Sequence, residues 1–245
     1  MLDLTRGTRI KLSLGGSEDE TPAWSPDGRW VAWSTNRDAQ RVILRKRADG
    51  SGSEEVLWSG PEHAHVTAYA PDGRLLFFEK QTVGRNTDTW VLPLDASGTE
   101  RRVLGSTFNE IGACLSPDGR WLAYVSDETG AGQVYVQPFP ALDARFPISS
   151  AGGTEPVWSR DGGQLFYRSG SDLFAVSIGS GQDFEPGIPE RLIEARAPGK
   201  GATHTGYDVA RDGRFLIVGD ESQGTDPLTV ILNWTEELKR LVPAR

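Results

Sequence analysis

Cysteine, methionine and long apolar runs are nearly absent from this sequence. Its 245 residues include one cysteine, Cys114, and one methionine, so no disulfide can form within the chain. Cys114 lies in an apolar stretch, where we expect a small buried residue and not a nucleophile. No run of about 18 apolar residues occurs, and the first residues lack the apolar core of a signal peptide. We therefore predict no membrane-spanning segment and no secretion signal, and the compartment stays open.

Basic residues are also in short supply. Lys and Arg number 26 against 34 Asp and Glu, which gives a net charge of -8 and a pI of about 5.0. A nucleic-acid-binding protein needs a basic face, and so does a protein that docks on anionic lipid. The composition therefore argues against both kinds of partner.

Glycine and proline are plentiful, and many of them belong to a repeat. The stretch "WSPDGRWVAW" returns as "YAPDGRLLFF", "LSPDGRWLAY", "WSRDGGQLFY" and "VARDGRFLIV". The Asp-Gly pairs of these copies begin at residues 27, 72, 118, 161 and 212. A period of roughly 40–50 residues is the size of one blade of a β-propeller.

Each copy has the chemistry of a tight turn. Proline presets φ at the second turn position, aspartate suits the third, and glycine accepts the left-handed conformation that follows. The predicted structural turn residues are Pro26, Asp27, Gly28, Asp72, Gly73, Asp118, Gly119, Asp161, Gly162, Asp212 and Gly213.

The segments after the turns predict strands that are covered on both faces. "WVAW", "LLFF" and "WLAY" are apolar without alternation, as in sheets packed face to face. We predict an all-β fold, a β-propeller of four-stranded antiparallel blades, in one domain over 1–245. The expected repeats are 1–19 (partial), 20–61, 62–107, 108–152, 153–198 and 199–245. Five full repeats and a partial one leave a five-bladed and a six-bladed parent open.

The repeat resembles a known family. "PAWSPDGRWVAWS" resembles the WD40-like (PD40) repeat of TolB-type β-propellers over essentially the whole chain. "GRWLAYVSDETGAGQVYVQPFP" and "LTVILNWTEELKRLVP" resemble the propeller that follows bacterial membrane-anchored serine/threonine protein kinases. That resemblance implies a sensor or interaction module, which in those receptors is thought to lie outside the cytoplasm.

Enzyme motifs are missing from the sequence. It contains no H-R-D, no D-F-G and no G-x-S-x-G. We therefore expect a chain that is not an enzyme, uses no cofactor and holds no metal.

Acidic residues and histidines recur where the chain crosses from one predicted blade to the next. A set of Glu and His at these crossings can bind a cation, a peptide terminus or a basic side chain. Charged residues at crossings are also commonly just solvated. The candidate partner- or ligand-binding residues are Glu20, His63, His65, Glu110, Glu155 and His204.

Two tryptophans share one repeat position. Trp24 and Trp158 both stand three residues before the turn aspartate. We expect both rings to wedge between blades.

These observations favour a non-catalytic propeller that binds a protein or peptide. A propeller hydrolase or lyase acting on a glycan or peptide is one alternative. A truncated propeller without independent function is the other.

Overall fold

The computed structural model describes residues 1–3, 7–13, 15, 18–81, 86–95, 98–194, 205–218 and 228–231. These residues form strands and turns and contain no helix. The chain divides into two compact units, residues 1–113 and 114–245, each described by itself below. The prediction of a single domain over 1–245 stays a prediction.

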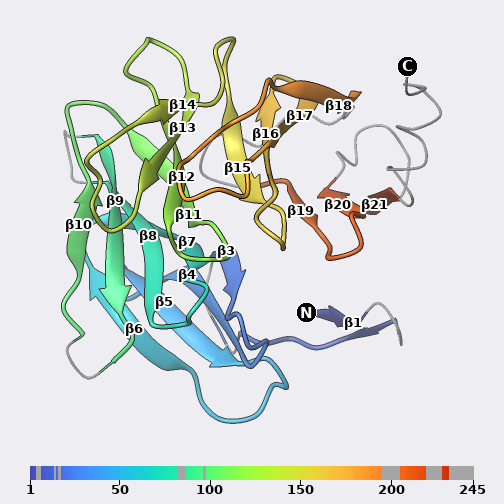
Figure 1. Cartoon of the computed structure of the whole chain (residues 1–245). Coiled ribbons are helices and arrows are strands. Elements are labelled where there is room, and N and C mark those ends of the chain that lie inside the picture. The colour runs from blue at the N-terminus through green and yellow to red at the C-terminus, as the bar shows by residue number, and fades with distance from the viewer. Residues whose placement is uncertain are drawn as a thin grey trace. The chain divides into compact units, whose positions relative to one another are not determined.

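The strands form a succession of antiparallel sheets, coloured in chain order in Figure 1. Each four-stranded sheet is a meander in which neighbours along the chain pair with each other, as in a propeller blade. The predicted all-β propeller fold is thereby confirmed. The first two blades are β3 (Asp19–Trp24), β4 (Trp30–Arg37), β5 (Gln40–Arg47) and β6 (Glu55–Gly60), then β7 (His63–Tyr69), β8 (Leu75–Gln81), β9 (Thr87–Pro93) and β10 (Arg101–Leu104).

Three further sheets follow. The third and fourth blades are β11 (Glu110–Leu115), β12 (Trp121–Ser126), β13 (Gln133–Pro138) and β14 (Phe146–Pro147), then β15 (Thr154–Trp158), β16 (Gln164–Ser169), β17 (Asp172–Ser177) and β18 (Glu190–Glu194). The fifth sheet has three strands, β19 (Tyr207–Val209), β20 (Phe215–Val218) and β21 (Leu228–Ile231). A two-stranded hairpin of β1 (Leu2–Asp3) and β2 (Thr8–Arg9) stands at the N-terminus.

The turn between the first two strands of a blade is closed by its own side chains. The Ser25 hydroxyl donates to Asp27 Oδ1 at 2.6 Å and accepts from the Trp30 N–H at 2.9 Å. The Gly28 N–H donates to the Ser25 carbonyl, and Gly28 has a φ of 68°. The hydroxyl of Ser25 is the first cause of the lowered pKa of Asp27. The same bonds recur in the third and fourth blades.

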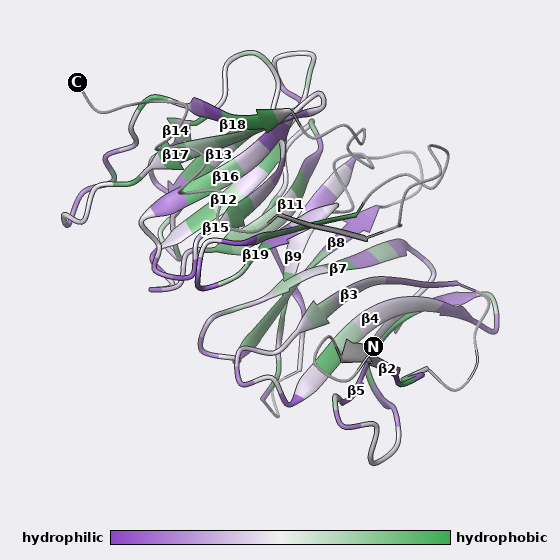
Figure 2. Ribbon diagram, turned by 90° about the vertical axis from the view of Figure 1, so that its right-hand side faces the viewer, coloured by the Kyte–Doolittle hydropathy of each residue, from purple (hydrophilic) through white to green (hydrophobic). Residues whose placement is uncertain are grey.

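Apolar side chains pack on both faces of the middle strands of the blades. In the first unit, Ile43, Leu76 and Phe78 belong to one cluster of buried residues formed by the first and second blades. In the second unit, Figure 2 shows apolar residues running along β12, β13 and β16. Such double-sided burial explains why the strand segments of the sequence do not alternate.

The first strand of several blades carries a β-bulge. Thr21 in β3, Gly112 in β11 and Glu155 in β15 all have positive φ, at the same place relative to the turn aspartate. The register shifts between Glu20 and Ala23 and between Thr154 and Val157. Since a bulge re-aims the side chains beside it, it decides where the candidate acids point.

Candidate functional site

Three of the six candidate residues come together in the first unit. Glu20 of β3 and His63 and His65 of β7 surround Arg41, which begins the buried part of β5. The rings of His63 and His65 are 4.7 Å apart, centroid to centroid. Arg41 was not among the residues predicted from the sequence.

Arg41 is the centre of this cluster. It is only 3% exposed, and its Nε donates to the Ala64 carbonyl at 2.8 Å. Its Nη1 donates to Asn36 Oδ1 at 3.1 Å, and its Nη2 donates to Glu20 Oε2. Bonds to a backbone carbonyl, an amide and a carboxylate fix the guanidinium in one orientation and match its charge.

The imidazole of His65 contacts both members of the Arg41–Glu20 pair. Arg41 Nη2 lies 3.2 Å from His65 Nδ1. The distance from the same Nδ1 to Glu20 Oε2 is 3.5 Å. Nδ1 can accept from the guanidinium in one tautomer of the ring and donate to the carboxylate in the other. His65 is thus held against both charged groups of this cluster.

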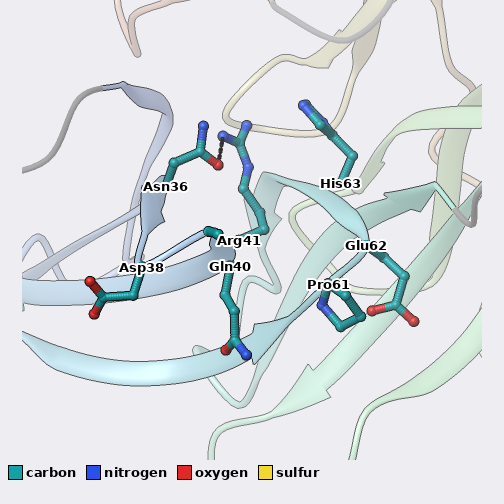
Figure 3. A pocket seen from close by; sticks show the side chains of 8 residues that line it. Asn36, Asp38, Gln40, Arg41, Pro61, Glu62 and His63 are labelled. Carbon is teal, nitrogen blue, oxygen red and sulfur yellow. Dashed lines mark hydrogen bonds between the residues drawn. The ribbon is translucent and has the colours of Figure 1, made fainter.

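A pocket of about 410 Å³ opens beside Arg41, and we call it the blade-end pocket (Figure 3). Its volume is within the range of small-ligand sites, and polar groups predominate among its residues. The view shows Arg41 and Asn36 joined by a hydrogen bond, with the His63 side chain to the right of Arg41. The lining residues are Asn36, Asp38, Ala39, Gln40, Arg41, Pro61, Glu62 and His63.

One wall of the blade-end pocket is a tight hairpin. Arg37 of β4 pairs with Gln40 of β5, and the two residues between them have positive φ, 49° at Asp38 and 62° at Ala39. Two positive φ values in a two-residue loop define a type I′ turn, which glycine usually occupies. Ala39 therefore holds a strained conformation at the pocket.

The carboxylate of Glu110 makes its hydrogen bonds within the loop that precedes its own strand, β11. Its carboxylate accepts from the backbone N–H of Ser106 at 3.1 Å and from the Ser106 hydroxyl. Its carbonyl accepts from the Thr89 hydroxyl at 2.7 Å. Glu110 is 6% exposed, which makes it a capping residue of the loop before β11.

Glu155 lies in the second unit and is 1% exposed. Its Oε2 accepts from the Gly206 N–H at 2.7 Å, and its carbonyl accepts from the Tyr207 hydroxyl at 2.8 Å. Burial raises the pKa of its carboxyl, against the opposing effect of the Gly206 N–H and the charge of Arg168. The sixth candidate, His204, lies outside the described residues. A ligand-binding role for all six candidates stays a prediction.

A third buried acid was not among the residues predicted from the sequence. Glu79 of β8 has no exposed surface, and its Oε1 accepts from the Gly112 N–H at 2.6 Å. Its Oε2 is buried with no hydrogen-bond partner among the described residues. Burial raises the pKa of Glu79 to about 8 despite the Gly112 N–H. The sequence signal for a buried acid is that this carboxylate directly follows the apolar run "LLFF".

The described part of the chain contains no group of three His, Cys, Asp or Glu side chains placed to hold a metal ion. The Cys114 thiol donates to the Pro156 carbonyl, and burial raises its pKa to about 12. None of the described segments is a helix long and apolar enough to cross a bilayer.

The fold and the repeat define the class, and comparison with known proteins gives the family. The chain is a β-propeller protein built from WD40-like repeats. The model of the TolB beta propeller domain, PD40, matches residues 20–185. The chain therefore belongs to the TolB-type propeller family.

Relatives of this chain include proteins named as enzymes. An uncharacterized protein of Agrobacterium fabrum, Atu1656, is 30% identical over 51% of this chain and 45% of its own length. The uncharacterized peptidase YuxL of Bacillus subtilis is 28% identical over 63% of this chain and 23% of its own. The chain thus spans less than half the length of these curated relatives.

Solved structures share the fold. TolB from Acinetobacter baumannii has a TM-score of 0.62 at 19% identity and covers 84% of this chain, which spans 49% of that structure. A periplasmic gluconolactonase of Pseudomonas aeruginosa has a TM-score of 0.60 at 19% identity, covering 94% of this chain and 76% of its own.

These comparisons correct one expectation. The absence of kinase and peptidase motifs led to the prediction that the chain is not an enzyme, and this inference is wrong. Its relatives and structural neighbours include peptidases and a gluconolactonase. The absence of kinase and peptidase motifs therefore does not exclude an enzymatic function for this chain. The resemblance to kinase-linked propellers stays a prediction.

Proposed function

We propose that this chain is the substrate-recognition propeller of a hydrolase-type protein and that it binds a peptide in the blade-end pocket. The observation that carries the proposal is the convergence of Glu20, Arg41 and His65 from three strands beside a cavity of about 410 Å³. A guanidinium that is buried and fixed by three acceptors is preorganised, so a ligand does not have to order it.

The relatives support a hydrolase context. YuxL, whose name describes a peptidase, is similar to this chain over only part of its length, so the similarity is to one portion of a larger protein. Loops on a rigid propeller are a common place for recognition residues. A propeller that selects peptides for hydrolysis agrees with both facts.

Peptide capture tests the proposal. The 245-residue chain is immobilised and exposed to a tryptic digest of casein, and the retained peptides are identified by mass spectrometry. Gln40→Trp should fill the pocket and reduce retention at least tenfold, since Gln40 is exposed and lines the cavity. Ser171→Trp, on the exposed turn between β16 and β17, is the matched control. Equal retention by Gln40→Trp and the parent would contradict the proposal.

A further inference from the structure

One ring nitrogen of His65 faces both members of the Glu20–Arg41 ion pair. His65 Nδ1 is 3.2 Å from Arg41 Nη2 and 3.5 Å from Glu20 Oε2. The guanidinium can only donate hydrogen bonds, and the ionised carboxylate can only accept them. The same nitrogen therefore meets a donor and an acceptor at nearly the same distance, and its protonation state decides which of the two it can bond.

Protonation of His65 changes that bond. A neutral ring can leave Nδ1 without a hydrogen, and this nitrogen then accepts from Arg41. A protonated ring has an N–H on both nitrogens, so Nδ1 has to donate, and of the two neighbours Glu20 is the one that can accept. Because Glu20 Oε2 also accepts from Arg41, the protonated ring competes with the guanidinium for one carboxylate oxygen. It also places a second positive charge against Arg41.

This competition reaches the blade-end pocket through Arg41. The guanidinium is 3% exposed and is also bonded to the Ala64 carbonyl and the Asn36 amide oxygen. Arg41 and Asn36 both line the pocket. A guanidinium that loses Glu20 to His65 is a buried charge without its counter-ion, which is strongly unfavourable, so it has to move toward solvent or repack. Either movement changes the wall of the pocket.

Within the described chain, the charged and titratable groups that face His65 come from four strands. β3 supplies Glu20, β5 supplies Arg41, and β7 itself supplies His63, whose ring centroid is 4.7 Å away. Glu79 of β8 pairs with His65 across the strands. Burial raises the pKa of Glu79 to about 8, so this carboxyl is largely uncharged at the pH where histidine ordinarily titrates. Glu20 is thus the carboxylate of this group that stabilises a protonated ring.

We infer that His65 is a pH-sensitive positioning residue, which leaves Arg41 paired with Glu20 while the ring is neutral and displaces Arg41 from Glu20 when the ring is protonated. This inference rests on the proposed function, since it gives peptide binding in the blade-end pocket a dependence on pH. Histidine is the side chain that ordinarily changes its charge between about pH 5 and 8. Binding should therefore be stronger at pH 8 than at pH 5.

Nuclear magnetic resonance tests the displacement without a ligand. The 245-residue chain is labelled with ¹⁵N in arginine and histidine, and the assigned Arg41 Nε–H signal and the His65 ring nitrogens are followed from pH 8.5 to 5. The Arg41 signal should change with the same midpoint as the His65 ring. His65→Gln cannot gain a proton and should abolish this change. His63→Gln, the matched control from the same strand, should keep it.

Glu20→Gln distinguishes competition for the carboxylate from simple proximity. The amide keeps an acceptor oxygen for Arg41 but lacks the charge that stabilises a protonated ring, so the titration midpoint of His65 should fall by roughly 1 pH unit. Glu18→Gln, at an exposed position two residues earlier, is the matched control and should leave the midpoint unchanged.

Peptide capture adds the functional readout. Retention of tryptic casein peptides should fall roughly tenfold from pH 8 to pH 5 for the parent, which corresponds to one pH unit of linkage, and should stay nearly constant for His65→Gln.

The outcomes separate the two proposals. An Arg41 signal that does not follow the His65 ring would overturn the inference, as would a His65 midpoint that is unchanged in Glu20→Gln. Retention that is equal at both pH values would overturn it as well and leave the proposed function standing. If the Arg41 signal follows His65 but no peptide is retained at any pH, the displacement of Arg41 is confirmed and the proposed function is wrong.

Discussion

Glu79 makes the stability of the first unit depend on pH in an unusual direction. Its carboxyl is fully buried, and burial raises its pKa from 4.5 to about 8, against the Gly112 N–H bond that favours the charged form. Between these two values the folded chain holds a proton that the unfolded chain has released. The stabilising effect of this proton is complete below about pH 4.5, and it is lost as pH rises toward 8.

The size of the effect follows from linkage. Within this pH window only the folded state binds the proton. Each unit by which the pH rises therefore lowers the free energy of unfolding by about 1.4 kcal/mol. From pH 5.5 to 7.5 the contribution of Glu79 should fall by about 3 kcal/mol. The variant Glu79→Gln is neutral at every pH, and its amide oxygen can still accept from Gly112.

Urea unfolding of parent and Glu79→Gln at pH 5.5, 6.5 and 7.5 measures this slope. The variant should gain about 3 kcal/mol relative to the parent across the series. Glu185→Gln, at an exposed position, should show no such trend. A difference between parent and Glu79→Gln that does not change with pH would refute the reasoning, because a carboxyl that ionises alike in both states gives no slope.

Three further changes address local structure. Gly119→Val should lower the free energy of unfolding by roughly 1 to 3 kcal/mol, because a β-branched residue is forced to a φ of 75°; unchanged urea midpoints would count against a conformational cost. Trp158→Ala should cost about 3 to 5 kcal/mol, since the ring is 6% exposed, contacts Phe184 and donates to the Cys114 carbonyl; a loss under about 1 kcal/mol would show that the ring is dispensable. Ala39→Gly should raise the melting temperature, because glycine relieves the positive φ of 62°; a lower melting temperature would mean that chain entropy outweighs strain.

The fold could be predicted from the sequence because its determinants are local. Each turn is specified by neighbouring residues such as Ser25, Asp27 and Gly28, and its recurrence fixes the length of a blade. Apolar runs such as "LLFF" then identify strands that are covered on both sides. Neither step requires knowledge of which blade packs on which.

The site could be predicted only in part, because its contacts join distant segments. Glu20 and His65 were singled out by position, but the arginine between them was not. A charged residue in a strand usually faces solvent, and nothing local reveals that Arg41 or Glu79 is buried. Their burial depends on the neighbouring blade and connection, which the sequence does not order in space.

The two tryptophans at one repeat position show the same limit. Trp158 is 6% exposed and fits the predicted wedge, whereas Trp24 is 51% exposed and does not. The prediction for Trp24 is wrong, because the burial of a repeated position depends on the segment that covers it. Identical residues at a repeated position form the same turn, but the segments that pack on them differ from blade to blade.

The self-contained turn has a consequence for how such a chain can change its length. Ser25, Asp27 and Gly28 complete their bonds within one short segment and need no partner from another blade. A stretch of gene that encodes such a segment with its strands can be copied or deleted without new turn residues elsewhere. A duplicated blade therefore includes all the residues that its turn needs. The pocket residues come from different blades, so a duplication does not by itself reproduce their contacts.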